Sequence, residues 1–219
     1  LPKFSLSFFR TQIAEGSMLP SGKMPYEVFI PAYRDEILSD TVMVYGNVDE
    51  VELVLNGKTI RRQTADKGPD SDYIPVPNGG NGKNFHFPPF TFYGVPKERG
   101  VLKAVGYHQG KKVAEYTVKT PGVPERLDIT YFESGKPATK NDLLIVYVRM
   151  LDKQGVLCPV NGIPVELSVQ GGEIVGPTSY PLEAGVASFL VRTGEISKIN
   201  INATGKGFST RKSLKVGKE

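Results

Sequence analysis

The sequence predicts an all-β protein in which two tandem β-sandwich domains follow a short helix. Glycine and proline, which favour turns, account for 24 and 17 of the 219 residues, a larger share than usual. Many short segments alternate apolar and polar residues, a pattern typical of half-buried strands. Turn signals separate these segments at short intervals, as expected for sandwiches of antiparallel sheets.

The composition excludes several classes of function. A single cysteine, Cys158, excludes a disulfide framework and a multi-cysteine zinc site. With only His86 and His108, sites built on several imidazoles are excluded. The 27 basic and 23 acidic residues are intermixed, so nucleic acid is not expected as a partner. No apolar run reaches the roughly 18 residues of a membrane span, and no membrane partner is expected.

Residues 1–13 predict the helix. Pro2 stands near its start, and four large apolar residues follow between Phe4 and Phe9. Such a helix is too short to be stable alone and too apolar to lie free in water. It must therefore dock on these domains or on another one, and we favour another domain.

Two hairpins organise the first domain. Strand-like alternation over residues 42–55 ends at Asn56-Gly57, a dipeptide that fits a two-residue turn because both residues tolerate positive φ. A second hairpin runs from residue 101 to 120, with its turn at residues 108–111. Between them lies an irregular segment, residues 63–84, whose length favours a functional or disordered loop.

The segment Thr120-Pro121-Gly122-Val123-Pro124 predicts a short, semi-rigid joint between the domains. Beyond it, about seven strand-like segments follow one another without a helical period. The second half is therefore predicted to be a second sandwich.

Several segments resemble a known family. VMVYGNVDEVELVLNG at 42–57, GVLKAVGY at 100–107 and KTPGV at 119–123 resemble the immunoglobulin-like domain that follows the catalytic barrel in bacterial β-galactosidase-like enzymes of glycoside hydrolase family 2. Residues 1–12 look like the last helix of such a barrel. ATKNDLLIVYVRMLDKQGVLCP at 138–159 is similar to the C-terminal bacterial immunoglobulin-like (invasin-like) module of these enzymes.

The resemblance implies a division into a barrel remnant and linker at 1–22, an immunoglobulin-like domain at 23–121 and a second one at 122–219. It also implies a parent enzyme that is a retaining glycosidase with two carboxylates about 5 Å apart on its barrel. A barrel needs about 250 residues and alternates strands with helices, which this chain does not. We therefore expect no catalytic residue and no cofactor here, and the catalytic barrel of the parent chain as partner.

The irregular segment also offers candidate binding residues. Asp66, Asp70 and Asp72, with Asn78 and Asn81, carry oxygen ligands suited to calcium, but their spacing matches no calcium motif, and a solvated loop is favoured. The glycines before Lys83 lack the spacing of a phosphate-binding loop.

An oligosaccharide is a further candidate ligand. The sequence contains no tryptophan, so sugar stacking would rely on tyrosine and phenylalanine. The candidate saccharide or interdomain contact residues are Tyr73, Phe85, His86, Phe92 and Tyr93.

Two functions remain open from the sequence. The first is a set of non-catalytic C-terminal accessory domains of a β-galactosidase-like hydrolase, with a structural or interdomain role. The alternative is a stand-alone carbohydrate-binding or adhesin-like tandem, against which the missing tryptophan counts. The resemblance to glycan-degrading enzymes leads us to expect a periplasmic or extracellular location.

Overall fold

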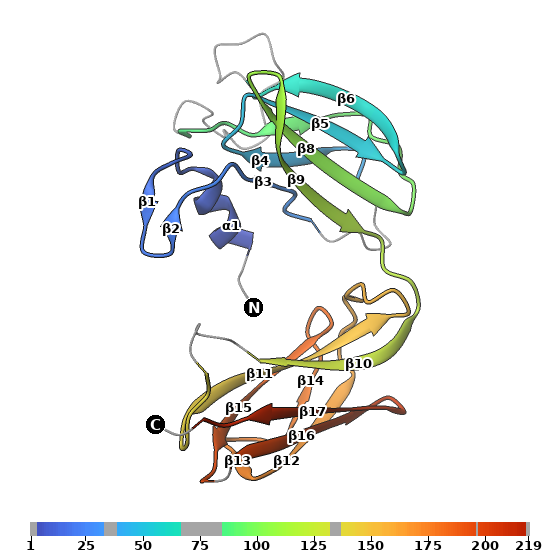
Figure 1. The fold of residues 1–219 in the computed structure, drawn as a ribbon. Coiled ribbons are helices and arrows are strands. Elements are labelled where there is room, and N and C mark those ends of the chain that lie inside the picture. The colour runs from blue at the N-terminus through green and yellow to red at the C-terminus, as the bar shows by residue number, and fades with distance from the viewer. Residues whose placement is uncertain (1–3, 33–38, 67–84, 132–136, 196, 218–219) are drawn as a thin grey trace. The chain divides into compact units, whose positions relative to one another are not determined.

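The computed structural model describes residues 4–32, 39–66, 85–131, 137–195 and 197–217. The chain divides into two compact units, Pro2–Thr120 and Pro121–Glu219, joined by one crossing of the chain (Figure 1). In the described residues all named strand pairs are antiparallel, and the helical content is the single short helix α1 (Phe4–Thr11). The all-β class and the short helix are both confirmed.

The first unit is a sandwich of unequal sheets with a small hairpin beside it. One sheet has the order β3-β4-β7 and the other the order β6-β5-β8-β9, while β1 pairs only with β2. The strands are β1 (Met18–Leu19), β2 (Gly22–Lys23), β3 (Val28–Phe29), β4 (Val42–Gly46), β5 (Glu50–Leu55), β6 (Lys58–Thr64), β7 (Phe90–Phe92), β8 (Val101–His108) and β9 (Lys111–Lys119).

Alternation along β4 and β5 builds the core of this unit. Every second residue of both strands is buried, and Val44, Val51 and Leu53 have no exposed surface. Phe90 and Leu102 complete the centre from β7 and β8. A shift of β5 by one residue would place Glu50 and Glu52 in this core, so the apolar pattern fixes its register.

Both predicted hairpins of this unit are confirmed. Asn56 and Gly57 have φ of 51° and 81°, and Gln109 and Gly110 have φ of 49° and 75°. Positive φ at both central residues matches the twist of the flanking strands. The first hairpin joins β5 to β6 and the second joins β8 to β9.

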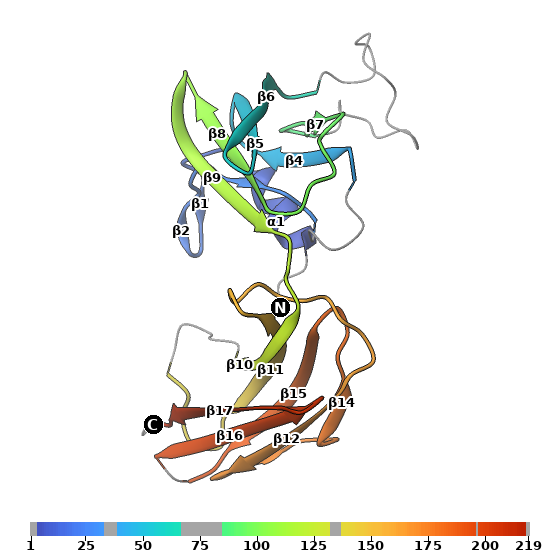
Figure 2. The same cartoon turned by 90° about the vertical axis from the view of Figure 1, so that its right-hand side faces the viewer.

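The second unit is a sandwich of four-stranded sheets with the orders β10-β11-β15-β13 and β14-β12-β16-β17, which form separate layers (Figure 2). Its core includes Val146, Val165, Val191 and Ile201, all without exposed surface. The strands are β10 (Pro124–Tyr131), β11 (Leu143–Asp152), β12 (Pro164–Gln170), β13 (Gly172–Ile174), β14 (Ser179–Pro181), β15 (Val186–Thr193), β16 (Lys198–Gly205) and β17 (Phe208–Lys215).

A buried carboxylate fixes the start of the second unit. Asp152 is only 4% exposed, and its Oδ2 accepts a hydrogen bond from the Gly122 amide at 2.7 Å. Its Oδ1 accepts hydrogen bonds from the amides of Gln154 and Val156, both at 2.8 Å. Burial raises the pKa of Asp152, but these backbone donors outweigh it and hold the pKa below its ordinary value.

Substitutions at Asp152 are expected to show how much these hydrogen bonds contribute to stability. In Asp152→Asn the remaining oxygen can still accept from the amides of Gln154 and Val156, but the side-chain NH₂ group faces the Gly122 N–H, which is also a donor. Asp152→Ala leaves all three backbone donors unpaired. We expect a loss in the free energy of unfolding of about 1 kcal/mol for the first variant and roughly 2–3 kcal/mol for the second. Urea unfolding followed by circular dichroism measures both, and equal losses would contradict this assignment.

The pH dependence of stability provides a further prediction. Because the folded pKa of Asp152 is lowered, its contribution is complete above the unfolded value of about 3.9 and is lost as the pH falls through the folded pKa. As the pH falls from 5 to the point of acid unfolding, the free energy of unfolding of the Asp152→Asn variant should therefore decrease less than that of the parent chain. Parallel acid-unfolding curves for the two proteins would contradict it.

Candidate functional site: a docked helix and the groove beside it

The inner face of α1 packs on the first sandwich through aromatic rings. Phe4 meets Phe29 of β3 in an edge-on contact, with ring centroids 5.6 Å apart. Phe8 contacts Tyr45 of β4 at 4.9 Å and Phe85 at 5.6 Å, both edge-on. The helix therefore docks on these domains, which is the less favoured of the two predicted alternatives, because residues i and i+4 present one aromatic face to the sandwich itself.

Polar contacts hold the same helix in register. The Arg10 guanidinium pairs with the Glu27 carboxylate, and this hydrogen-bonded pair raises the pKa of Arg10 further above its ordinary range. The Gln12 side chain donates to the Phe87 carbonyl at 3.0 Å and accepts from the Phe87 amide at 3.2 Å. Each contact joins the helix end to a different segment of the sandwich, so the helix cannot slide or rotate without breaking them.

Asn47 is the buried centre of this junction. Its Oδ1 accepts a hydrogen bond from the Glu27 amide at 2.6 Å, and its Nδ2 donates to the carbonyls of Ile13 and Pro25, both at 3.0 Å. A buried side-chain amide that pairs with two carbonyl acceptors and one backbone N–H donor ties the chain around residues 13, 25–27 and 47 to one point. No local sequence pattern identifies Asn47, because Gly46-Asn47 resembles an ordinary turn.

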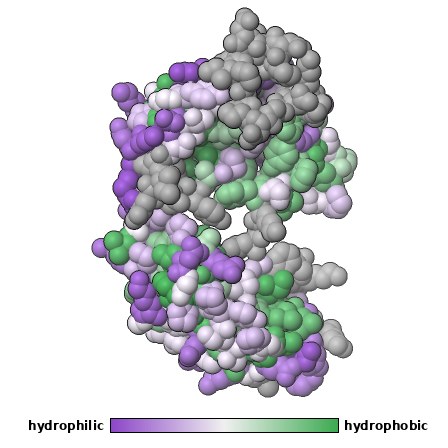
Figure 3. Space-filling view, turned by 180° about the vertical axis from the view of Figure 1, so that it is seen from behind, coloured by the Kyte–Doolittle hydropathy of each residue, from purple (hydrophilic) through white to green (hydrophobic). Residues whose placement is uncertain are grey.

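The outer face of the same region is apolar and exposed. Leu6 and Phe9, three residues apart on α1, are 52% and 65% exposed, and Met18 of the β1–β2 hairpin is 74% exposed. Figure 3 shows apolar residues gathered where the first unit carries α1 and this hairpin. Exposed apolar residues that gather on one face are a feature of surfaces that contact other molecules or domains.

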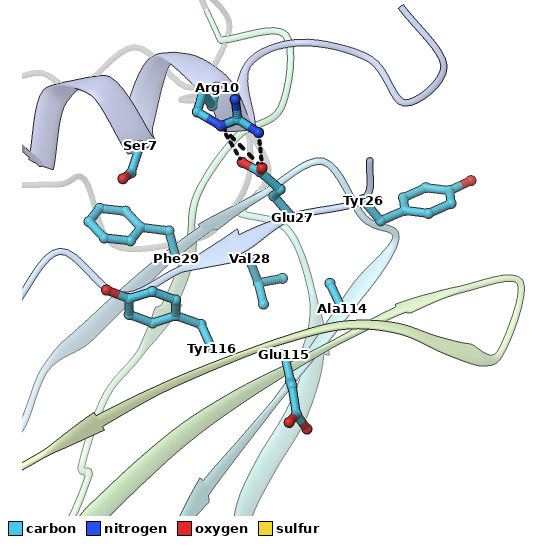
Figure 4. Close-up of a pocket in the computed structure, with 9 residues that line it drawn as sticks. All are labelled: Ser7, Arg10, Tyr26, Glu27, Val28, Phe29, Ala114, Glu115 and Tyr116. Atoms are coloured by element: carbon cyan, nitrogen blue, oxygen red, sulfur yellow. Dashed lines mark hydrogen bonds and ion pairs between the residues drawn. The ribbon is translucent and has the colours of Figure 1, made fainter. Parts of the chain in front are cut away.

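A groove of about 350 Å³ opens between α1, β3 and β9. Both β3 and β9 are edge strands of their sheets, so the groove follows the open edge of the sandwich. Figure 4 shows the Arg10–Glu27 pair along one side and the rings of Phe29 and Tyr116 along the other. Its lining residues are Ser7, Arg10, Tyr26, Glu27, Val28, Phe29, Ala114, Glu115 and Tyr116.

The charged groups around the groove are paired. Glu115 bonds Lys112 at 2.6 Å, which, with Lys103, holds the pKa of Glu115 below its ordinary value. At the far end, Tyr26 stacks on His108, whose Nδ1 lies 3.0 Å from Oδ1 of Asp49. A retaining glycosidase needs one carboxyl group that is protonated. Because its pKa is lowered, Glu115 does not suit that role.

The predicted saccharide contacts do not gather at this groove. Phe85 packs against Phe8 of the helix, and exposed His86 contacts the Phe87 ring at 4.6 Å. Tyr93 is half-buried. Phe92 is 1% exposed and belongs to the core, because all three residues of β7 are buried. Tyr73 lies outside the described residues.

Of the candidate calcium ligands, only Asp66 lies within the described residues. Asp66 accepts hydrogen bonds from Thr91, at 2.5 Å from its hydroxyl and 3.1 Å from its amide, so both carboxylate oxygens are engaged. Asp70, Asp72, Asn78 and Asn81 lie outside the described residues. Among the residues that are described, no cluster of acidic, histidine or cysteine side chains suits a metal ion. That part of the chain also contains no helix long and apolar enough to cross a membrane.

Comparisons with known proteins agree with this architecture. Residues 39–114 match a family described as a domain of unknown function, DUF4982. A β-galactosidase of Thermoanaerobacter pseudethanolicus is 29% identical over 205 residues, which cover 88% of this chain and 25% of that protein. A β-galactosidase of Rhizobium radiobacter is 30% identical over 129 residues, which cover 58% of this chain and 92% of that sequence.

A solved structure shares the fold over most of the chain. The family 2 glycosyl hydrolase of Bacteroides cellulosilyticus matches with a TM-score of 0.62 and 25% identity, over 80% of this chain and 24% of that one. The fold and the comparisons together define a pair of immunoglobulin-like accessory domains. The chain belongs to glycoside hydrolase family 2, as the C-terminal immunoglobulin-like region of its β-galactosidase-like members.

Asn47→Ala is expected to loosen the junction between α1 and the sandwich. The variant leaves the Glu27 amide and the Ile13 and Pro25 carbonyls without their partner, so we expect a loss in the free energy of unfolding of about 2 kcal/mol. Asn161→Ala is the control, because exposed Asn161 accepts one hydrogen bond, from the Ala184 amide. Urea unfolding measures both variants, and an equal loss in both would contradict the role of Asn47.

Proposed function

We propose that this chain is a non-catalytic accessory region of a β-galactosidase-like hydrolase that acts on β-linked glycans, and that α1 joins the first sandwich to the catalytic domain. The observation that carries the proposal is the two-sided helix. Phe4 and Phe8 face the sandwich, while Leu6 and Phe9 face outward and stay exposed. A helix with apolar residues on both faces is suited to lie between two bodies.

The exposed side chains of Leu6 and Phe9 favour association with another surface. Fully burying a large apolar side chain contributes about 1.5–3 kcal/mol, and Leu6 and Phe9 still expose 52% and 65% of their surface, so covering both would stabilise a contact by roughly 2–3 kcal/mol. The Thermoanaerobacter relative is four times as long as its matched part, since that match covers 25% of it. A catalytic domain elsewhere in such a chain is the partner that we propose for this surface.

The carboxylates of the groove support a non-catalytic role. Glu27 is paired with Arg10, and Glu115 with Lys112 and Lys103. Retaining glycosidases place an ionised nucleophile and a protonated acid on either side of the scissile bond, about 5 Å apart. Two carboxylates that are both engaged by cations do not provide that division of roles.

The first test is direct. We expect the purified 219-residue chain to release no nitrophenol from 4-nitrophenyl β-D-galactopyranoside or from the corresponding β-D-glucuronide. A polypeptide that carries the same chain behind a family 2 catalytic domain should turn over one of them. Turnover by the isolated chain that persists after repeated purification would overturn the proposal.

The second test concerns the outer face of α1. The double variant Leu6→Ser, Phe9→Ser should change the stability of the isolated chain only slightly, because more than half of the surface of each side chain is already exposed. In the longer polypeptide it should lower the melting temperature by several degrees, because the two side chains would lose their burial there.

The matched control is Leu143→Ser, Ile145→Ser, which removes two exposed apolar side chains from β11 of the second unit. We expect a smaller change from the control in the longer polypeptide. An equal effect of both double variants, or none from the first, would contradict a contact through α1.

A further inference from the structure

We propose that the groove between α1, β3 and β9 binds one unit of a neutral saccharide, separately from the contact made by the outer face of α1. The choice of a β-linked sugar as ligand rests on the proposed function. The groove itself is inferred from its shape, its aromatic wall, its serine hydroxyl group and its balanced charge.

The shape suits a small polar ligand. A volume of about 350 Å³ lies at the lower end of the range for ligand-binding pockets. The groove lies at the open edge of the sandwich, where β3 and β9 are not hydrogen-bonded to each other. A sugar ring could therefore enter from solvent without displacing a strand.

The aromatic wall is fixed before any ligand binds. Tyr116 contacts Phe29 edge-on, with centroids 5.2 Å apart, and Phe29 is in turn held by Phe4. Phe29 is buried, whereas Tyr116 stays half-exposed at the groove. Because the Tyr116 ring is already held in place, the apolar face of a sugar could stack on it with little further loss of side-chain entropy.

A hydroxyl group faces the same space. Figure 4 shows the Ser7 side chain extending from α1 toward the groove, and its Oγ has no hydrogen-bond partner within the described part of the chain. The Glu27 carboxylate, held by Arg10, is a positioned acceptor on the same side. Together they provide one donor or acceptor and one fixed acceptor for sugar hydroxyls.

The charge balance favours a neutral ligand. Arg10 is compensated by Glu27, and the carboxylate of Glu115 is paired with lysines and points away from the groove in Figure 4. No uncompensated cation among the described lining residues would attract a carboxylate group. An anionic sugar should therefore bind more weakly than a neutral one.

The test uses the ¹⁵N-labelled 219-residue chain and methyl β-D-galactopyranoside as the probe. We expect saturable amide shifts at Ser7 and along residues 114–116. The dissociation constant should be on the order of 1 mM, which is the usual affinity for a ligand of this size. Methyl β-D-glucuronide should bind several-fold more weakly.

Two matched pairs of variants locate the site. Ser7→Ala should weaken binding about threefold to tenfold through the lost hydrogen bond. Ser5→Ala, on the exposed side of the same helix, should leave binding unchanged. Tyr116→Leu should abolish saturable binding, whereas Tyr147→Leu on β11 of the second unit should not. Retained dispersion of the amide spectrum confirms that each variant is folded.

Absence of saturable shifts, shifts centred outside the groove, or tighter binding of the glucuronide would each overturn this inference. These outcomes can be distinguished from a failure of the proposed accessory role. That role is tested by the activity of the isolated chain and by Leu6 and Phe9, which line the other face of the helix. Failure of the sugar titration would therefore leave the contact with a catalytic domain standing.

Discussion

The contact between α1 and the edge of the first sandwich is the constraint on which the other features depend. An isolated helix of eight residues is not stable in water, so its structure comes from the surface that it covers. Three aromatic contacts, an ion pair and the hydrogen bonds of buried Asn47 supply that surface. Once the helix is held in this orientation, Leu6 and Phe9 must face outward and Ser7 must face the groove.

One helix therefore creates two distinct surfaces. The outer surface consists of the exposed apolar side chains Leu6 and Phe9, which are suited to association with another protein domain. The groove is mixed in character, with an aromatic wall and compensated charges, which are suited to a small polar molecule. Both surfaces are absent from a sandwich without α1, so the first unit and the helix are best regarded as one functional piece.

Local signals made much of the fold predictable. Asn56-Gly57 and Gln109-Gly110 require positive φ within a few residues of alternating strands, so the hairpins follow from short sequence windows. The sandwich class follows in the same way from many such windows, and the family from several matching segments.

The junction and the groove could not be predicted in this way. Phe8 meets Tyr45, and Asn47 meets Ile13, across more than thirty residues, and no local pattern encodes such pairs. The aromatic residues near Phe92 in the sequence favour a contact surface, but β7 is buried on both sides. The groove combines residues from three distant segments, and each of them resembles ordinary strand or helix sequence.

Amide hydrogen exchange across residues 4–11 tests the central claim most directly, because exchange reports how firmly α1 is held. In the isolated chain these amides should exchange more slowly than those of a free peptide of the same sequence. They should slow further when the chain is joined to a catalytic domain, because the outer face becomes covered as well. Free-peptide exchange rates in the isolated chain would contradict the docking of α1 on the sandwich, and unchanged rates on joining would contradict its role between two bodies.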